Sequence, residues 1–100
     1  MTSYPKTPYT RDKRILEACR TLPCQNCEAQ DGTVAAAHSN QSQHGKGRGI
    51  KASDEYVAAL CSKCHSMIDQ GSRLMRVERE RIWNLAHAKT RIELEAMGVL

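Results

Sequence analysis

Apolar residues near the N-terminus recur at the spacing of a short helix. Ile15, Leu16 and Cys19 fall on one side of a helix over 11–20, where they can face a core. Thr10 is a suitable N-cap, since its hydroxyl can accept a hydrogen bond from a backbone amide of the first turn. The pattern therefore predicts a short, basic N-terminal helix.

Two short apolar runs flank a long polar stretch in the middle of the chain. The run at 33–37 has the sequence TVAAA, and the run at 56–60 has the sequence YVAAL. Runs of this length that contain β-branched or aromatic residues predict two strands. Between them, 39–54 contains three glycines and almost no apolar residues, which predicts a long loop.

The C-terminal part of the chain carries two helical patterns. The segment 61–71 begins a helix directly after the second strand, and its final glycine can end that helix. A longer helix is predicted from about 73 to 97. Its apolar positions at near-helical spacing are Leu74, Val77, Ile82, Leu85, Ile92 and Ala96.

These elements predict one domain of α+β class. The domain covers 10–100, with its core in 24–70, and 1–9 forms a loosely held arm that contains two prolines. The large side chains that fill a core are scarce: the 100 residues include no Phe, one Trp and three Tyr. A bound metal can make up the shortage, because structural zinc adds about 10 kcal/mol or more to the folding free energy.

Four of the five cysteines form two pairs with the spacing of zinc ligands. Cys24 and Cys27 form one CxxC pair, and Cys61 and Cys64 form the other. One pair alone could be a redox dithiol, but two pairs without a thioredoxin-like pattern favour one shared structural zinc. The second pair and the following histidine also fit c-type haem attachment, but the chain shows no export signal. Cys19, on the apolar side of its helix, is interpreted as a core residue.

A shared zinc would join the segment before the first predicted strand to the junction between the second strand and its helix. It would thereby bring polar side chains from the strands and the helix together. It would carry His38, at the end of the first strand, towards His65 and Asp69. These two residues lie four positions apart and share one face of the following helix. Imidazole and carboxylate groups that converge there can hold a catalytic divalent cation.

The charge of the chain permits a polyanionic partner. Fifteen Lys and Arg residues against eleven Asp and Glu residues give a formal net charge of +4. This balance suits nucleic acid without requiring it. The glycines of the long loop allow backbone amides to approach phosphates closely, and basic side chains can add contacts. These side chains are Lys46, Arg48 and Lys51.

The stretch from Cys24 to Asp69, nearly half of the chain, resembles the HNH, or ββα-metal, nucleases. The matching motifs are CQNC, TVAAAHSN and HGKGRGIKASDEYVAALCSKCHSMID. Within that superfamily the chain resembles the small phage and prophage proteins of the YbcO-like family. The resemblance implies a small ββα-metal core with a four-cysteine structural zinc site, a short N-terminal helix and a long C-terminal helix.

The same resemblance implies roles for individual residues. His38 matches the general base, which takes a proton from the attacking water, and His65 matches a histidine that ligates the catalytic Mg²⁺ or Mn²⁺. Asp69 stands one turn further along, at a position where a second ligand is often found. Many family members carry a metal-binding Asp or His where this chain has Ala37. The candidate replacements from the loop are Asp54, His44 and Asn40.

Metal-dependent hydrolysis of DNA phosphodiester bonds is the function that these features favour. A neutral imidazole can accept a proton near pH 7, and a divalent ion can stabilise charge in the transition state. Two alternatives stay open: a non-catalytic zinc module that binds nucleic acid, and a zinc-stapled interaction domain. The long helix could also pair in a homodimer. The resemblance implies a phage or prophage origin, and the absence of an apolar leader or membrane span predicts a cytoplasmic protein in the bacterial host.

Overall fold

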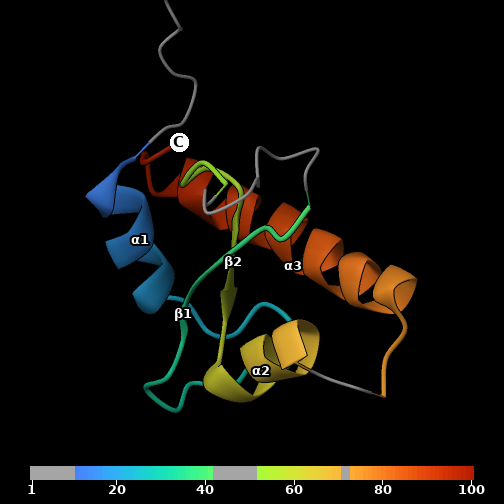
Figure 1. Cartoon of the computed structure of the whole chain (residues 1–100). Helices are drawn as coiled ribbons and strands as arrows, with labels where there is room; N and C mark the ends of the chain where they lie inside the picture. The colour runs from blue at the N-terminus through green and yellow to red at the C-terminus, as the bar shows by residue number, and fades with distance from the viewer. Residues whose placement is uncertain (1–10, 42–51, 71–72) are drawn as a thin grey trace, which may run out of the picture.

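The described part of this computed structural model consists of a two-stranded antiparallel sheet with three helices around it (Figure 1). The structure describes residues 11–41, 52–70 and 73–100. The predicted α+β class is confirmed. The elements, in chain order, are α1 (Lys13–Arg20), β1 (Ala35–His38), β2 (Val57–Leu60), α2 (Ser62–Gln70) and α3 (Arg76–Ala96).

Helix α1 begins two residues later than the sequence suggested. Its N-cap is Asp12, whose carboxylate accepts a hydrogen bond from the backbone amide of Arg14 at 2.9 Å. The prediction of Thr10 as the N-cap is therefore wrong, because the stronger acceptor two residues later takes this position. The predicted core positions Ile15 and Cys19 are buried, at 1% and 0% exposure.

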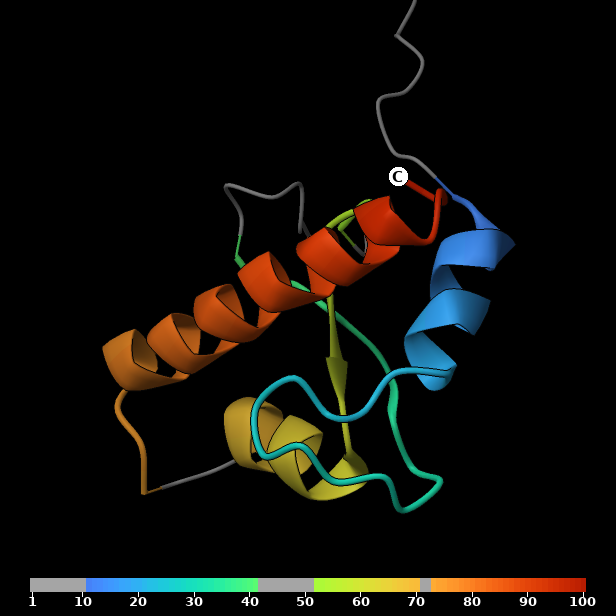
Figure 2. The same ribbon diagram turned by 180° about the vertical axis from the view of Figure 1, so that it is seen from behind.

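The two strands pair as a short ladder in which alanines predominate. His38 lies opposite Val57 at one end, and Ala35 lies opposite Leu60 at the other. Both strands fall within one or two residues of their predicted positions. All four residues of β2 are buried, and α3 packs across this strand (Figure 2).

Helix α3 turns a different face to the core from the one predicted. Its buried residues are Trp83, Ala86, Thr90 and Leu94. Of the predicted apolar stripe, Ile82 packs against the core, but Val77, Leu85 and Ile92 are exposed, at 58%, 61% and 64%. The prediction failed because the core-facing stripe contains a threonine and an alanine, whereas larger apolar residues occupy the opposite face.

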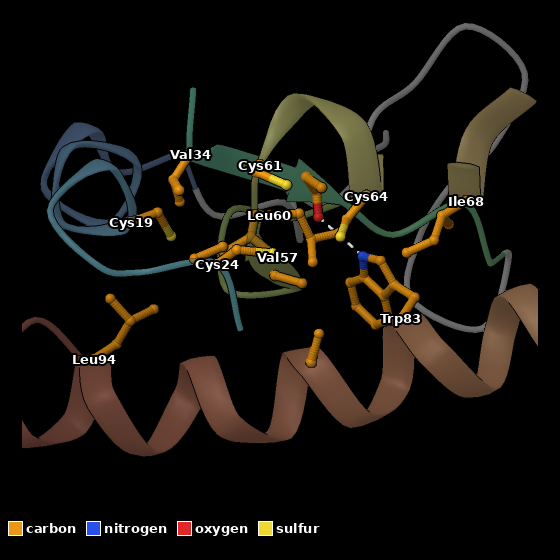
Figure 3. Packing of buried hydrophobic residues seen from close by; sticks show 14 of the residues in the cluster. Cys19, Cys24, Val34, Val57, Leu60, Cys61, Cys64, Ile68, Trp83 and Leu94 are labelled. Atoms are coloured by element: carbon orange, nitrogen blue, oxygen red, sulfur yellow. Dashed lines mark hydrogen bonds between the residues drawn. The ribbon is translucent and has the colours of Figure 1, made fainter. Parts of the chain in front are cut away.

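Two ring side chains of α3, Trp83 and His87, form hydrogen bonds with the two strands. Trp83 donates a hydrogen bond from Nε1 to the carbonyl oxygen of Ala37 at 3.0 Å (Figure 3). His87 stacks on the Trp83 ring at 4.8 Å, and its Nδ1 lies 2.8 Å from the carbonyl oxygen of Val57. A carbonyl oxygen only accepts, so Nδ1 carries the proton. These contacts give His87 a packing role that fixes the end of the sheet where His38 lies.

Removing the Thr90 hydroxyl should destabilise the fold. Thr90 is fully buried, and its Oγ1 accepts from the Ala59 amide at 3.0 Å and donates to the Ala86 carbonyl at 2.8 Å. Thr90→Val keeps the shape but leaves the Ala59 amide without this acceptor, which should lower the free energy of unfolding by about 1–3 kcal/mol in urea titrations. Thr90→Ser, which keeps the hydroxyl, is the matched control. Equal stability of wild type and Thr90→Val would contradict this interpretation.

Within the described ranges, no helix is both long enough and apolar enough to cross a membrane.

Candidate functional site

The four predicted zinc ligands lie together at the base of the sheet. The Sγ atoms of Cys24, Cys27, Cys61 and Cys64 all lie within 4.8 Å of one another, and those of Cys27 and Cys61 are 3.6 Å apart. Three segments supply them: the turn after α1, the end of β2 and the first turn of α2. The sulfurs of three of them are seen close to one another in Figure 3. Four thiolates in this arrangement form a set of ligands for a tetrahedral metal ion such as zinc.

Backbone hydrogen bonds hold the first cysteine pair against the sheet. The Gln25 amide donates to the carbonyl oxygen of Ala59 in β2 at 2.8 Å, and the Cys24 amide donates to the Ala29 carbonyl at 2.9 Å. Two nitrogen donors reach the sulfurs themselves: Asn26 Nδ2 lies 3.3 Å from Cys64 Sγ, and the Cys27 amide lies 3.4 Å from Cys24 Sγ. Contacts of this kind orient metal ligands and stabilise their negative charge.

The electrostatics of this cluster favour a cation. Burial opposes ionisation of Cys24, but the backbone amides of Cys27, Cys61 and Asn26 outweigh it and lower the pKa of Cys24 to about 6. Desolvation, reinforced by the neighbouring cysteines, raises the pKa of Cys64 to about 12. Cys24 thus ionises easily, whereas the raised pKa values of Cys27 and Cys64 show that these thiols resist further negative charge. A divalent cation would remove that resistance, since metal binding drives deprotonation of its thiol ligands.

Cys19 takes no part in the cluster. Its side chain is fully buried on the core side of α1, and desolvation raises the pKa of its thiol from 9.0 to about 11. A neutral thiol in these surroundings is inert. The interpretation of Cys19 as a core residue is confirmed.

The buried Cys19 thiol should make stability fall at high pH. Because folding raises the pKa of this thiol, the neutral thiol contributes fully to the free energy of unfolding below about pH 9. This contribution is lost as the pH rises towards 11. The loss should reach about 2 kcal/mol, and Cys19→Ala should remove this part of the pH dependence in urea titrations between pH 8 and 11. Parallel stability curves for wild type and Cys19→Ala across that range would contradict the assignment.

His38, the predicted general base, is paired with a buried carboxylate. Its Nε2 lies 2.7 Å from Oδ1 of Asp54, with the two side chains 16% and 4% exposed. The second oxygen of Asp54 accepts a hydrogen bond from the Asp12 amide at 2.6 Å, just before α1. Both carboxylate oxygens are thus engaged. The sequence named Asp54 as a candidate ligand but gave no sign of this orienting contact with His38.

His65 and Asp69 share one face of α2, as their spacing predicted. His65 Nε2 lies 2.9 Å from Asp69 Oδ2, and both side chains are more than one-third exposed. Asn40 Nδ2 donates to the other oxygen of Asp69 at 2.8 Å, so the segment after β1 contacts α2. Asn40 follows His38 by two residues, a span of at most about 7 Å. The end of β1 and the exposed face of α2 therefore border one surface.

The predicted catalytic ligands do not form one compact cluster. In the part of the chain that the structure describes, the four cysteines are the one group of three or more His, Cys, Asp or Glu residues that could hold a metal ion. His38, Asp54, His65 and Asp69 instead form two separate pairs. Four further predicted residues lie outside the described ranges: His44, Lys46, Arg48 and Lys51.

Comparison with known proteins found no family model, curated protein or solved structure that matches this chain. The resemblance to HNH nucleases therefore stays a prediction, and the function is argued from the geometry of the site.

Proposed function

We propose that the protein is a metal-dependent nuclease that hydrolyses phosphodiester bonds in DNA, with His38 as the general base. The observation that carries the proposal is the 2.7 Å contact between His38 Nε2 and Asp54 Oδ1. An ionised carboxylate only accepts hydrogen bonds, so Nε2 carries the proton. The lone pair of a neutral His38 is then on Nδ1, where it can accept a proton from water.

Asp54 is suited to hold the imidazole in this state. It is 4% exposed at the side chain and is fixed by the Asp12 amide, so it can restrain the His38 ring without moving itself. A carboxylate behind a histidine fixes its tautomer and stabilises the imidazolium that forms once the proton has been taken. In this mechanism His38 removes the proton from the attacking water, and Asp54 is its positioning residue.

His65 and Asp69 are the residues that would hold the catalytic cation. Magnesium commonly binds through one or two carboxylates, with water and substrate phosphate completing its coordination, so the exposed Asp69 carboxylate suits it and His65 lies beside that carboxylate. A cation there would stabilise negative charge on the phosphate and on the leaving oxygen. Asn40 holds Asp69 through its other oxygen and so keeps the pair beside the end of β1.

The four-cysteine site supports this proposal as the structural part of the molecule. A zinc ion there would join the turn after α1 to the junction of β2 and α2. That junction sets the direction of α2 and hence the position of His65 and Asp69. The proposed setting is the cytoplasm of a bacterial host, with the protein encoded by a phage or prophage.

A plasmid assay with a series of divalent ions tests the proposed function. Supercoiled DNA should be nicked or linearised when Mg²⁺ or Mn²⁺ is added. It should stay intact when EDTA replaces the added ion, in an incubation too short to remove the zinc. DNA retention without cleavage under any ion would replace the proposal with a nucleic-acid-binding zinc module. Neither cleavage nor retention would favour a protein-interaction domain.

A further inference from the structure

A pocket opens between the start of α3 and the end of α2, next to the proposed cation ligands. Its volume is about 230 Å³. This is smaller than the roughly 300–1,000 Å³ that drug-sized ligands occupy, so it suits a small group. Trp83 and Ile68 form an apolar floor, at 4% and 6% exposure, and Figure 3 shows them side by side. The polar lining is Asn40, Gln41, Arg76, Arg79 and Glu80.

Arg79 has an unsatisfied donor at this pocket. Its Nε is buried and has no hydrogen-bond partner among the residues that the structure describes. Its Nη1 donates to the carbonyl oxygen of Ile68 at 3.4 Å, the long end of the hydrogen-bond range. A buried donor on a charged group that lacks a partner is costly, and an oxyanion would satisfy it. The planar guanidinium matches phosphate oxygens in particular, because two of its N–H groups can bind two of them.

Charge at the pocket also favours an anion. Arg76 reaches the opening from one turn earlier in α3, and its partner Glu80 lies 3.3 Å away. The Arg76 side chain is 86% exposed, so this ion pair contributes little and can be exchanged for another partner. Two guanidinium groups against one carboxylate leave a net positive charge around the opening.

The pocket adjoins the proposed reaction site. Ile68 directly precedes Asp69, and Asn40 both lines the pocket and donates to Asp69 at 2.8 Å. We propose that Arg79, assisted by Arg76, binds a backbone phosphate of the nucleic acid next to the one that is cleaved. This inference rests on the proposed function for the source of the phosphate. It adds a phosphate-binding site on α3 to the basic loop residues that the sequence predicted as nucleic-acid contacts.

A binding measurement in a cleavage-blocked background tests this assignment. With His38→Ala as the parent, fluorescence anisotropy of a labelled DNA duplex should show about tenfold weaker binding for Arg79→Gln. The slope of log affinity against log salt should become shallower by about 1, because one phosphate contact is lost. Arg79→Lys should fall between the two, since it keeps the charge but loses the planar fork.

Arg91→Gln is the matched control. Arg91 lies on the same helix, is 45% exposed and pairs with Glu95, so the substitution removes the same charge far from the pocket. Its affinity and salt slope should stay close to those of the parent. Equal losses in Arg79→Gln and Arg91→Gln would overturn the pocket assignment. Zinc content and thermal unfolding of each variant confirm that the fold persists, and Arg79→Lys carries the test if Arg79→Gln is unstable.

A second readout separates this inference from the proposed function. Titration of wild type with inorganic pyrophosphate should shift the Arg79 Nε–Hε resonance in ¹⁵N spectra, and Arg76→Gln should weaken that response. A resonance that does not move with pyrophosphate overturns the pocket. If wild type binds no DNA, the proposed function is wrong and nucleic acid is not the source of the phosphate. This conclusion holds whether or not pyrophosphate shifts the Arg79 resonance.

Discussion

Replacing Cys61 with serine should unfold the protein. Cys61 is 1% exposed, and its sulfur lies 3.6 Å from that of Cys27 in the other pair. A serine hydroxyl does not replace a thiolate as a zinc ligand, so the two pairs would lose their common ion. Structural zinc contributes about 10 kcal/mol or more, whereas the whole stability of a domain is about 5–15 kcal/mol. Little stability should remain.

Circular dichroism and metal analysis of the purified variant measure this effect. Cys61→Ser should show reduced helical signal, no cooperative melting transition and no bound zinc. Cys19→Ala removes a cysteine that is equally buried but lies outside the cluster, and this control should stay folded with its metal. A Cys61→Ser protein that melts at the temperature of wild type would show that the cluster has no structural role.

Replacing His38 with alanine should reduce DNA cleavage by about a hundredfold to ten-thousandfold, the usual contribution of a general base. The fold should survive, because the pairing of residue 38 with Val57 depends on the backbone and the ring lies at the end of β1. Single-turnover cleavage of a labelled duplex with Mg²⁺ is the measurement. The zinc content should match that of wild type and a cooperative melting transition should remain, at a lower temperature because buried Asp54 loses its His38 partner.

Asp54→Asn tests the positioning role of Asp54 and should have a smaller effect than His38→Ala. Its side-chain oxygen can still accept from His38, but the negative charge that stabilises the imidazolium is gone. Cleavage should therefore fall by less than in His38→Ala. If His38→Ala cleaves DNA as fast as wild type, His38 is not the base and the mechanism fails.

The four-cysteine cluster and the elements around it could be predicted from local sequence. The CxxC spacing places two thiols on one turn, so a single shared metal site was the simplest use of two such pairs. The contact between His65 and Asp69 followed from their positions four residues apart on a helix. Such predictions succeed because the geometry of a turn or a helix is fixed by the backbone alone.

Other parts of the site depend on tertiary packing and left no local signal. Asp54 meets His38 across 16 residues of chain, and the Asp12 amide that fixes it comes from 42 residues away. The core face of α3 was misjudged because Thr90, a polar residue, is buried to pair with the Ala59 amide. No local pattern distinguishes Arg79 from other helix arginines, because the pocket that it lines also needs Ile68 of α2 and Asn40.

Metal analysis of the purified chain tests the central claim most directly. Elemental analysis combined with native mass spectrometry should find one zinc ion per chain, with Cys24, Cys27, Cys61 and Cys64 protected from a thiol reagent until the metal is removed. A metal-free chain that is fully folded, with these four thiols freely reactive, would contradict the account.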